Sequence, residues 1–287
     1  MLQELLGYDK PAHPFITLID INNIRDLSEY RDRQMIVGFY TITLKDGFNC
    51  KLKYGRQYYD FSEGSMMFTA PGQVITVEYK PSDTQGWMLC FHPDLIRKSQ
   101  LNSRIKDYTF FSYDSSEALH LSEREEKTIN NIVNTIKEEF NRNPDIYSEQ
   151  LIVSNLEVLL NYARRFYGRQ FITRTRVNKD VVSRFEALLT DYFESKSLVD
   201  NGLPKVKYLA KKMGYSTNYL SDLLKKETGR NTKEHIDFEL IEKAKFLLLG
   251  TEKSVAQVAY MLGFEYPGHF SKFFKKKTGI SPSEYRE

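Results

Sequence analysis

The C-terminal part of this 287-residue chain contains one pattern written twice, and this repeat limits the possible fold more than any other feature. The first copy is residues 206–229, VKYLAKKMGYSTNYLSDLLKKETG, and the second is residues 255–279, VAQVAYMLGFEYPGHFSKFFKKKTG. With one inserted residue, the copies share a valine, an alanine, two glycines, a serine, two lysines and a threonine at matching positions. A repeat with a period of about fifty residues indicates two similar supersecondary units.

Each copy has the pattern of a helix, a tight turn and a second helix. Gly214 suits the left-handed residue that ends the first helix, and Ser216 suits the cap of the next one. The second copy has the same kind of helix start and stop signals at Ser254, Gly263 and Pro267. The second helix of each unit then carries apolar residues at helical spacing, namely Leu220, Leu223 and Leu224, and Phe270, Phe273 and Phe274.

The outward side of the second helix in each unit carries short polar and basic side chains. In a helix-turn-helix motif this helix lies in the major groove of DNA, where such side chains reach the base edges. An ordinary helical hairpin with a solvated face is the alternative, but two copies joined by a helix favour DNA binding. The candidate DNA-binding residues are Asn218, Ser221, Asp222 and Lys225 in the first unit, and Gly268, His269, Lys272, Lys275 and Lys276 in the second.

This region resembles the DNA-binding domain of the AraC/XylS family of transcription regulators. The resemblance is carried by MGYSTNYLSDLLKKETG (213–229), LIEKAKFLLLG (240–250) and LGFEYPGHFSKFFKKKTGISPSEYR (262–286). It implies a bacterial transcription factor whose two recognition helices enter successive major grooves on one face of the DNA. The implied partners are double-stranded promoter or operator DNA, RNA polymerase, a small-molecule effector and a second copy of the chain.

A helix expected over residues 236–249 joins the two units. Its length of about 20 Å makes it a rigid spacer, which suits two readers on adjacent turns of DNA, about 34 Å apart. Asp180 suits the N-cap of a further helix that supports the first unit. The DNA-binding domain is therefore predicted to span residues 180–287.

The overall charge of the chain gives little support to DNA binding, whereas the charge of one helix supports it. Residues 180–287 hold 18 Lys and Arg against 15 Asp and Glu, and the rest of the chain balances at 23 and 23. The net charge of +3 thus lies in the predicted DNA-binding domain but is small. The run of Lys272, Lys275, Lys276 and Lys277 on one helix is the stronger indication.

The N-terminal part, from about residue 13 to residue 92, reads as short strands separated by glycine turns, which is typical of a small barrel or jelly roll. It resembles the cupin-like effector domain of many AraC-type proteins through YYDFSEGSMMFTAPGQ (58–73) and GWMLCFHPDLI (86–96). The predicted fold class is therefore α+β with two domains: a cupin-like β-barrel followed by two helices, and an all-α domain with two helix-turn-helix units.

Aromatic residues are frequent in the predicted barrel. If they point inward beside a few polar groups, they form a pocket for a small-molecule effector; if not, they fill the barrel. The residues concerned are Phe39, Tyr40, Phe48, Tyr54, Tyr58, Tyr59, Phe61, Phe68, Tyr79, Trp87 and Phe91.

A small-molecule-binding or enzymatic cupin is the rival function, with the helical tail making protein contacts. Such enzymes need clustered histidines with a carboxylate to hold a metal. The chain has five histidines, no two of which lie close together in the sequence, and only His92 falls on an expected barrel strand. No glycine-rich phosphate loop or nucleophile elbow appears. The sequence therefore predicts no metal, no cofactor and no catalytic residue.

Two helices are expected after the barrel. Ser122 and Glu125 form a capping box for the first, and Ser148 suits the cap of the second. Each helix carries one apolar stripe, which either packs against the barrel or forms a dimer contact. Residues 168–179, GRQFITRTRVNK, have no apolar period and are predicted to be a linker, so the effector domain is residues 1–167.

Segments that direct a chain to a membrane are not visible. No apolar run is long enough to cross a bilayer, and the N-terminus lacks the pattern of a signal peptide. Cys50 and Cys90 lie in strand-like runs without metal-binding spacing. We expect buried, reduced thiols in a cytoplasmic protein.

Overall fold

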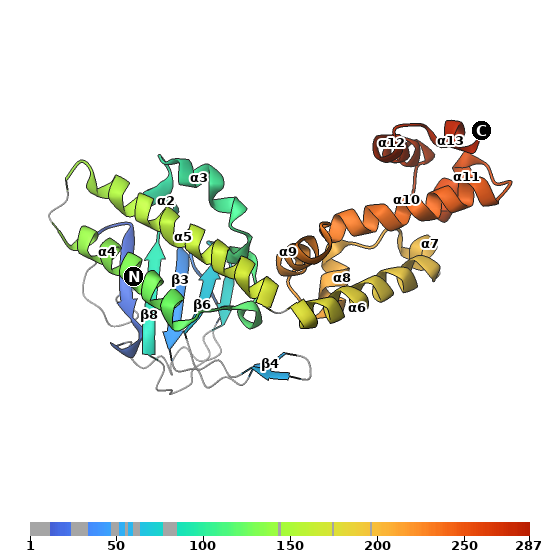
Figure 1. Cartoon of the computed structure of the whole chain (residues 1–287). Helices are drawn as coiled ribbons and strands as arrows, with labels where there is room; N and C mark the ends of the chain where they lie inside the picture. The colour runs from blue at the N-terminus through green and yellow to red at the C-terminus, as the bar shows by residue number, and fades with distance from the viewer. Residues whose placement is uncertain are drawn as a thin grey trace. The chain divides into compact units, whose positions relative to one another are not determined.

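The structure is a computed structural model of the chain, in which two compact units, Met1–Thr173 and Arg174–Glu287, are described separately (Figure 1). The first unit combines an antiparallel sheet with helices, and the second is helical, so the coarse prediction of an α+β chain is confirmed. The helices within the described part of the chain are all too short or too polar to span a lipid bilayer. The described residues are 12–23, 34–46, 52–54, 57–59, 64–76, 85–142, 145–173, 175–195 and 197–287.

A five-stranded antiparallel sheet forms the centre of the first unit. Its order is β1-β8-β3-β6-β9, with β1 and β9 at opposite edges, so the described strands do not close into the predicted cupin-like barrel. Two further pairs, β2-β7 and β4-β5, stand apart from it. The strands are β1 (Ile16–Asp20), β2 (Gln34–Ile36), β3 (Tyr40–Asp46), β4 (Leu52–Tyr54), β5 (Gln57–Tyr59), β6 (Ser65–Thr69), β7 (Val74–Thr76), β8 (Gln85–Phe91) and β9 (Leu119–His120).

Strand β9 ends the sheet because a side chain occupies its outer edge. The side-chain amide of Gln170 accepts from the backbone N–H of His120 at 2.8 Å and donates to the carbonyl of Ala118 at 3.1 Å. Arg169 donates to the carbonyl of His120 at 2.7 Å and also pairs with Glu125 through two hydrogen bonds. The backbone groups of this edge strand are thus paired with side chains rather than with another strand.

The register of the strands separates the residues of the two sheet faces, because successive side chains in a strand alternate. Tyr40 pairs with Phe91, Ile42 with Leu89 and Phe68, and Leu44 with Trp87 and Met66. This face is covered by two long helices, as Figure 1 shows for α4 and α5. The opposite face carries smaller or more flexible side chains, namely Thr41, Thr43, Met67, Thr69, Met88 and Cys90.

The predicted pocket aromatics that the structure describes lie mainly on the helix-covered face. Phe68 contacts Phe110 and Tyr167, with ring centroids 4.5 and 6.2 Å away. Tyr40 stacks on Phe91 at 5.0 Å. These rings therefore fill the core between sheet and helices, which differs from both expectations, a pocket lining and the filling of a barrel. Trp87 shares this face and donates from Nε1 to Asn130 of α4 at 2.8 Å. The others of the set lie outside the residues whose side chains are described, except Phe39, which is half-buried.

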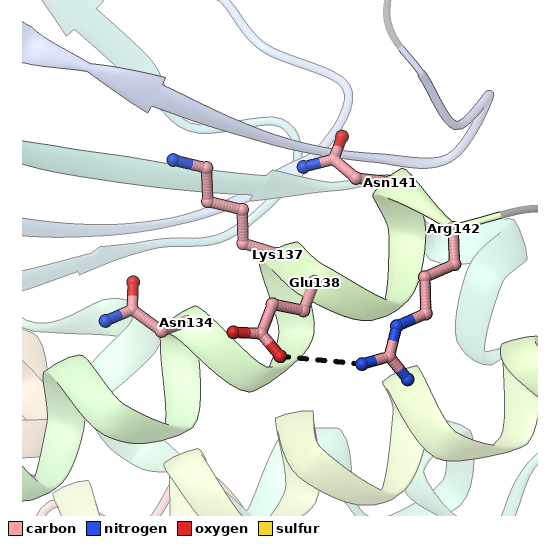
Figure 2. A pocket seen from close by; sticks show the side chains of 5 residues that line it. All are labelled: Asn134, Lys137, Glu138, Asn141 and Arg142. Carbon is pink, nitrogen blue, oxygen red and sulfur yellow. Dashed lines mark ion pairs between the residues drawn. The ribbon is translucent and has the colours of Figure 1, made fainter.

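A hollow of about 510 Å³ lies on the outer side of helix α4. Figure 2 shows that its side chains come from the end of that helix and from Arg142, which follows it, and that Glu138 pairs with Arg142; their atoms lie 3.7 Å apart. The lining is polar and contains no aromatic ring, so this hollow is not the aromatic pocket expected from the sequence. Its five lining residues are Asn134, Lys137, Glu138, Asn141 and Arg142.

Helices α4 and α5 follow the sheet and pack against each other. The predicted capping box is confirmed, because Ser122 accepts from the N–H of Glu125 while the Glu125 carboxylate accepts from that of Ser122. The predicted cap at Ser148 is wrong: the carboxylate of Asp145 accepts from the backbone N–H groups of Tyr147 and Ser148. The helices and turns of this unit are η1 (Ile21–Asn23), α2 (Pro93–Ile96), α3 (Gln100–Arg104), η3 (Ile105–Asp107), η4 (Thr109–Ser112), η5 (Ser115–Glu117), α4 (Glu123–Asn141) and α5 (Ser148–Thr173).

The apolar stripes of α4 and α5 are buried inside the first unit. Of the two roles considered from the sequence, packing within the unit and a dimer contact, this burial agrees with the first. Ile129, Val133 and Ile136 of α4 are almost completely buried. On the outer side of α5, Leu151 and Val158 remain exposed by 47% and 42%. The dimer contact is compatible with this exposed pair and stays a prediction.

The described residues of the predicted linker, 168–173 and 175–179, are helical. Helix α5 continues to Thr173 because Gln170 and Phe171 are buried, at 1% and 5% exposure. Helix α6 (Thr175–Glu194) follows, so the predicted cap Asp180 lies inside that helix and is exposed. The boundary between the two units falls within the predicted range, but the described residues of that range belong to helices rather than to an irregular linker.

The second unit contains the repeat. The joining helix begins at Thr232 and its predicted inward residues, including Leu240 and Ala244, are buried. Threonine hydroxyls end both recognition helices alike: Thr228 donates to the carbonyl of Leu224 and Thr278 to that of Phe274. The helices are α6, α7 (Ser197–Asn201), α8 (Val206–Met213), α9 (Thr217–Thr228), α10 (Thr232–Gly250), α11 (Val255–Met261), α12 (Pro267–Thr278) and α13 (Pro282–Arg286).

Candidate nucleic-acid interface

Two helix-turn-helix units, α8–α9 and α11–α12, form the candidate interface. The turns contain Gly214 and Gly263, both with φ of +77° in the left-handed region that favours glycine. Ser216 accepts from the N–H of Tyr219 at 3.2 Å and so caps α9, as predicted. Pro267 occupies the first turn of α12, also as predicted. The second helices therefore begin where the repeat predicted, with a side-chain cap in α9 and a proline in α12.

The groove-facing side of α9 lies opposite its buried leucines. Leu220, Leu223 and Leu224 are at most 1% exposed. At 100° per residue, the opposite side is centred on Asn218, Asp222 and Lys225. Asn218 and Asp222 are half-buried and Lys225 is exposed. The amide of Asn218 has the geometry to pair with adenine, and the carboxylate of Asp222 can accept from cytosine N4.

Ser221 does not behave like the other candidates on α9. Its hydroxyl lies 2.9 Å from the hydroxyl of Thr232, which is fully buried at the start of α10. The contact ties α9 to α10 and directs the serine hydroxyl away from a groove. We therefore interpret Ser221 as a packing residue rather than as a base contact.

Helix α12 presents a more basic surface than α9. Gly268, Lys272 and Lys275 share the side opposite the buried Phe270 and Phe274, and all three are exposed. Lys276 is also exposed but lies about 100° further round the helix than Lys275. Lysine at 272 can donate to guanine O6 and N7, whereas Lys276 is better placed for a phosphate.

His269 lies at the flank of α12 rather than at the centre of its outward side. Counted from the start of each helix, it corresponds to Tyr219, which is 2% exposed in α9. The His269 ring is exposed and meets the ring of Tyr266 edge-on, with centroids 5.4 Å apart. The histidine therefore reaches the edge of a groove at most.

The contacts between the recognition helices and their supports were not predicted. Lys277 belongs to the lysine run of α12, yet its ammonium pairs with Asp237 of α10 at 2.7 Å. His235 of α10 lies 2.8 Å from the hydroxyl of Thr228, and burial lowers the pKa of this imidazole. Sequence reasoning missed these pairs because each joins a recognition helix to α10, and the packing of two helices is not visible in their apolar periods.

Two helix-turn-helix units in tandem, joined by one long helix, define a class of DNA-binding proteins that present two recognition helices from a single domain. The second unit of the chain matches a family model described as a helix-turn-helix domain, over residues 209–287. The chain belongs to the AraC/XylS family of transcription regulators, which confirms the prediction made from the repeat.

Three relatives show how far the similarity extends. The chain is 28% identical over 195 residues to the uncharacterized HTH-type transcriptional regulator YijO of Escherichia coli, covering 67% of this chain and 64% of that protein. It is 26% identical to the lactose operon transcription activator of Staphylococcus xylosus, covering 81% and 78%. It is 26% identical to the arabinose operon regulatory protein of Escherichia coli, covering 98% and 92%. The chain thus spans just under two thirds of the length of YijO, and the relatives are named as regulators rather than enzymes.

Proposed function

We propose that the chain regulates transcription by binding a specific double-stranded DNA site in the bacterial cytoplasm. The observation that carries the proposal is the exposed basic side of α12, with Lys272, Lys275 and Lys276, on the second of two helix-turn-helix units. The outward side of α9, with the polar residues Asn218 and Asp222, supplies a second surface for base recognition that is less basic than α12. Because lysines contact phosphates, the basic side of α12 is expected to contribute more to affinity than α9.

Binding by the full chain is expected to depend on salt. Lysines that neutralise phosphates release condensed counterions, so log K should fall linearly with log salt concentration. The test selects bound fragments from a random DNA pool and then measures the affinity of the selected site between about 50 and 200 mM salt, a range over which several phosphate contacts lose about 10³-fold or more. Absence of any selected sequence, or an affinity that salt does not change, would contradict the proposal.

The first unit is proposed to sense a small organic molecule, as the effector domain of a regulator. The helix-covered face of the sheet is filled by Tyr40, Phe68 and other rings, which leaves the opposite face for a ligand. That face carries hydroxyl, thioether and thiol groups, among them Thr43, Met67 and Met88. Burial raises the pKa of the Cys90 thiol to about 12, so this group stays protonated at neutral pH. A closed cupin-like barrel around this face is the arrangement we propose.

Replacing Thr43 by phenylalanine is expected to abolish the response to effector while DNA binding persists. The larger ring fills space on the proposed ligand face, next to Met67 and Met88. The assay compares operator affinity with and without the small-molecule fraction of a bacterial extract. Thr135→Phe, on the exposed side of α4, is the matched control and should respond normally. An unchanged response in Thr43→Phe would place the effector elsewhere.

We propose a regulatory rather than an enzymatic role, because the relatives that the chain resembles are named as regulators. Contact with RNA polymerase would follow from the proposed regulatory role and stays a prediction.

A further inference from the structure

Each of the two recognition helices makes an intramolecular contact through one residue near its C-terminal end. In α12 this residue belongs to the lysine run. The residue that follows Lys226 in α9 and Lys276 in α12 is the eleventh of each helix. It is Glu227 in the first helix-turn-helix and Lys277 in the second, so the charge is reversed between the two copies of the repeat. In both copies this residue contacts the long helix that precedes its unit.

In the first helix-turn-helix, Glu227 makes a hydrogen bond to helix α6. The side-chain N–H of Asn178 donates to the carboxylate of Glu227 at 2.8 Å. Asn178 is 2% exposed, although it lies in a segment that is polar in sequence. A buried amide that donates to a carboxylate fixes the direction of both side chains. The C-terminal half of α9 is thereby held against α6.

In the second helix-turn-helix, Lys277 makes an ion pair with helix α10. The ammonium of Lys277 lies 2.7 Å from the carboxylate of Asp237, with side-chain exposures of 37% and 17%. The same ammonium lies 6.0 Å from the centre of the Phe273 ring. The start of α12 lacks a side-chain cap at Tyr266, whereas Ser216 caps α9. Helix α12 therefore depends more on its C-terminal contact for its orientation.

We propose that Glu227–Asn178 and Lys277–Asp237 are equivalent positioning contacts, each setting the tilt of one recognition helix on the long helix behind it. This inference rests on the proposed DNA-binding function. It assigns the ammonium of Lys277 to an intramolecular contact and leaves Lys272, Lys275 and Lys276 of the same run for DNA. Lys272 lies about 7.5 Å along the helix from Lys277, so a change of tilt there displaces the reading side chains.

The neighbouring lysines give a matched test in the full chain. Lys277→Met keeps the aliphatic stem near Phe273 but removes the charge that pairs with Asp237. We expect operator affinity to fall about tenfold, while affinity for random DNA and the salt slope stay unchanged. The control Lys276→Met should lose operator and random DNA alike and lower the salt slope by about one.

An exchange of the paired charges separates positioning from mere stability. Lys277→Glu alone places two carboxylates together and should lose more discrimination than Lys277→Met. Adding Asp237→Lys restores an ion pair of opposite sense, and the ratio of operator to random affinity should return towards that of the unchanged chain. Circular dichroism melts of each variant show that the folded protein is being compared.

Two results would overturn the inference. One is a salt slope that falls by about one in Lys277→Met, because that identifies Lys277 as a phosphate contact. The other is a charge exchange that melts normally but regains no discrimination. If the unchanged chain selects no DNA at all, the proposed function fails instead, so the two failures are distinguishable.

Discussion

Gly263→Ala is expected to lower the free energy of unfolding of the second unit by about 2–5 kcal/mol, since it combines a left-handed backbone with overpacking. A Cβ at this position would lie 2.5 Å from the carbonyl oxygen of Leu198 and 3.0 Å from the Cα of Gly202. Both are backbone atoms, which cannot move aside as the end of a flexible side chain can. The turn between α11 and α12 would have to move away from α7 and from Gly202, which follows that helix.

Gly214→Ala is the matched control for this prediction. It has the same φ of +77° in the equivalent turn, but nothing lies within 4 Å of the position that the added methyl group would take. Its effect should be only that of the backbone conformation, about 1–2 kcal/mol. The measurement is urea unfolding followed by circular dichroism, while the fluorescence of the single tryptophan, Trp87, reports on the first unit. Equal losses in the two variants would show that the close approach at Gly263 is unimportant.

Lys272→Ala is expected to weaken operator binding by about 1–3 kcal/mol and to relax the preference at one base pair. The side chain is exposed on the outward side of α12, and a lysine in a major groove can donate to guanine O6 and N7. The equivalent position in α9 is Asp222, so a base contact there takes the opposite hydrogen-bonding role. The measurement is binding to the selected operator and to variants changed at each base.

The control for Lys272 is Lys276→Ala on the same helix. We propose a phosphate contact for Lys276, so its loss should weaken all sequences alike and reduce the salt slope by about one. The two alanine variants remove the same charge from positions about one helical turn apart. If both lose operator and random DNA equally, α12 does not read bases through Lys272.

The repeat predicted the second unit well because its signals are local. A capping serine, a left-handed glycine and apolar residues at helical spacing all act within one turn of the chain, and Ser216, Gly214 and Leu220 are found as expected. The family assignment follows from the same residues. The roles of Ser221 and Lys277 depended on Thr232 and Asp237, whose proximity only the packing of α10 reveals.

The first unit was less predictable because strand alternation does not say which face is covered. Tyr40, Phe68 and Phe91 alternate in the way that a pocket lining would, yet they pack under α4 and α5. The extent of helix was underestimated for a related reason. Gln170 and Asn178 look like solvated linker residues, but each is buried with a hydrogen-bonding partner on another element.

The side chain of Gln170 also bears on how the protein avoids aggregation. An edge strand with free backbone groups is a template on which a strand of another molecule can add. At β9 the amide of Gln170 already satisfies the N–H of His120 and the carbonyl of Ala118. A neighbouring molecule therefore finds no open hydrogen bonds at these two groups, and the turn of helix that looked like a polar linker keeps the sheet from growing past this edge.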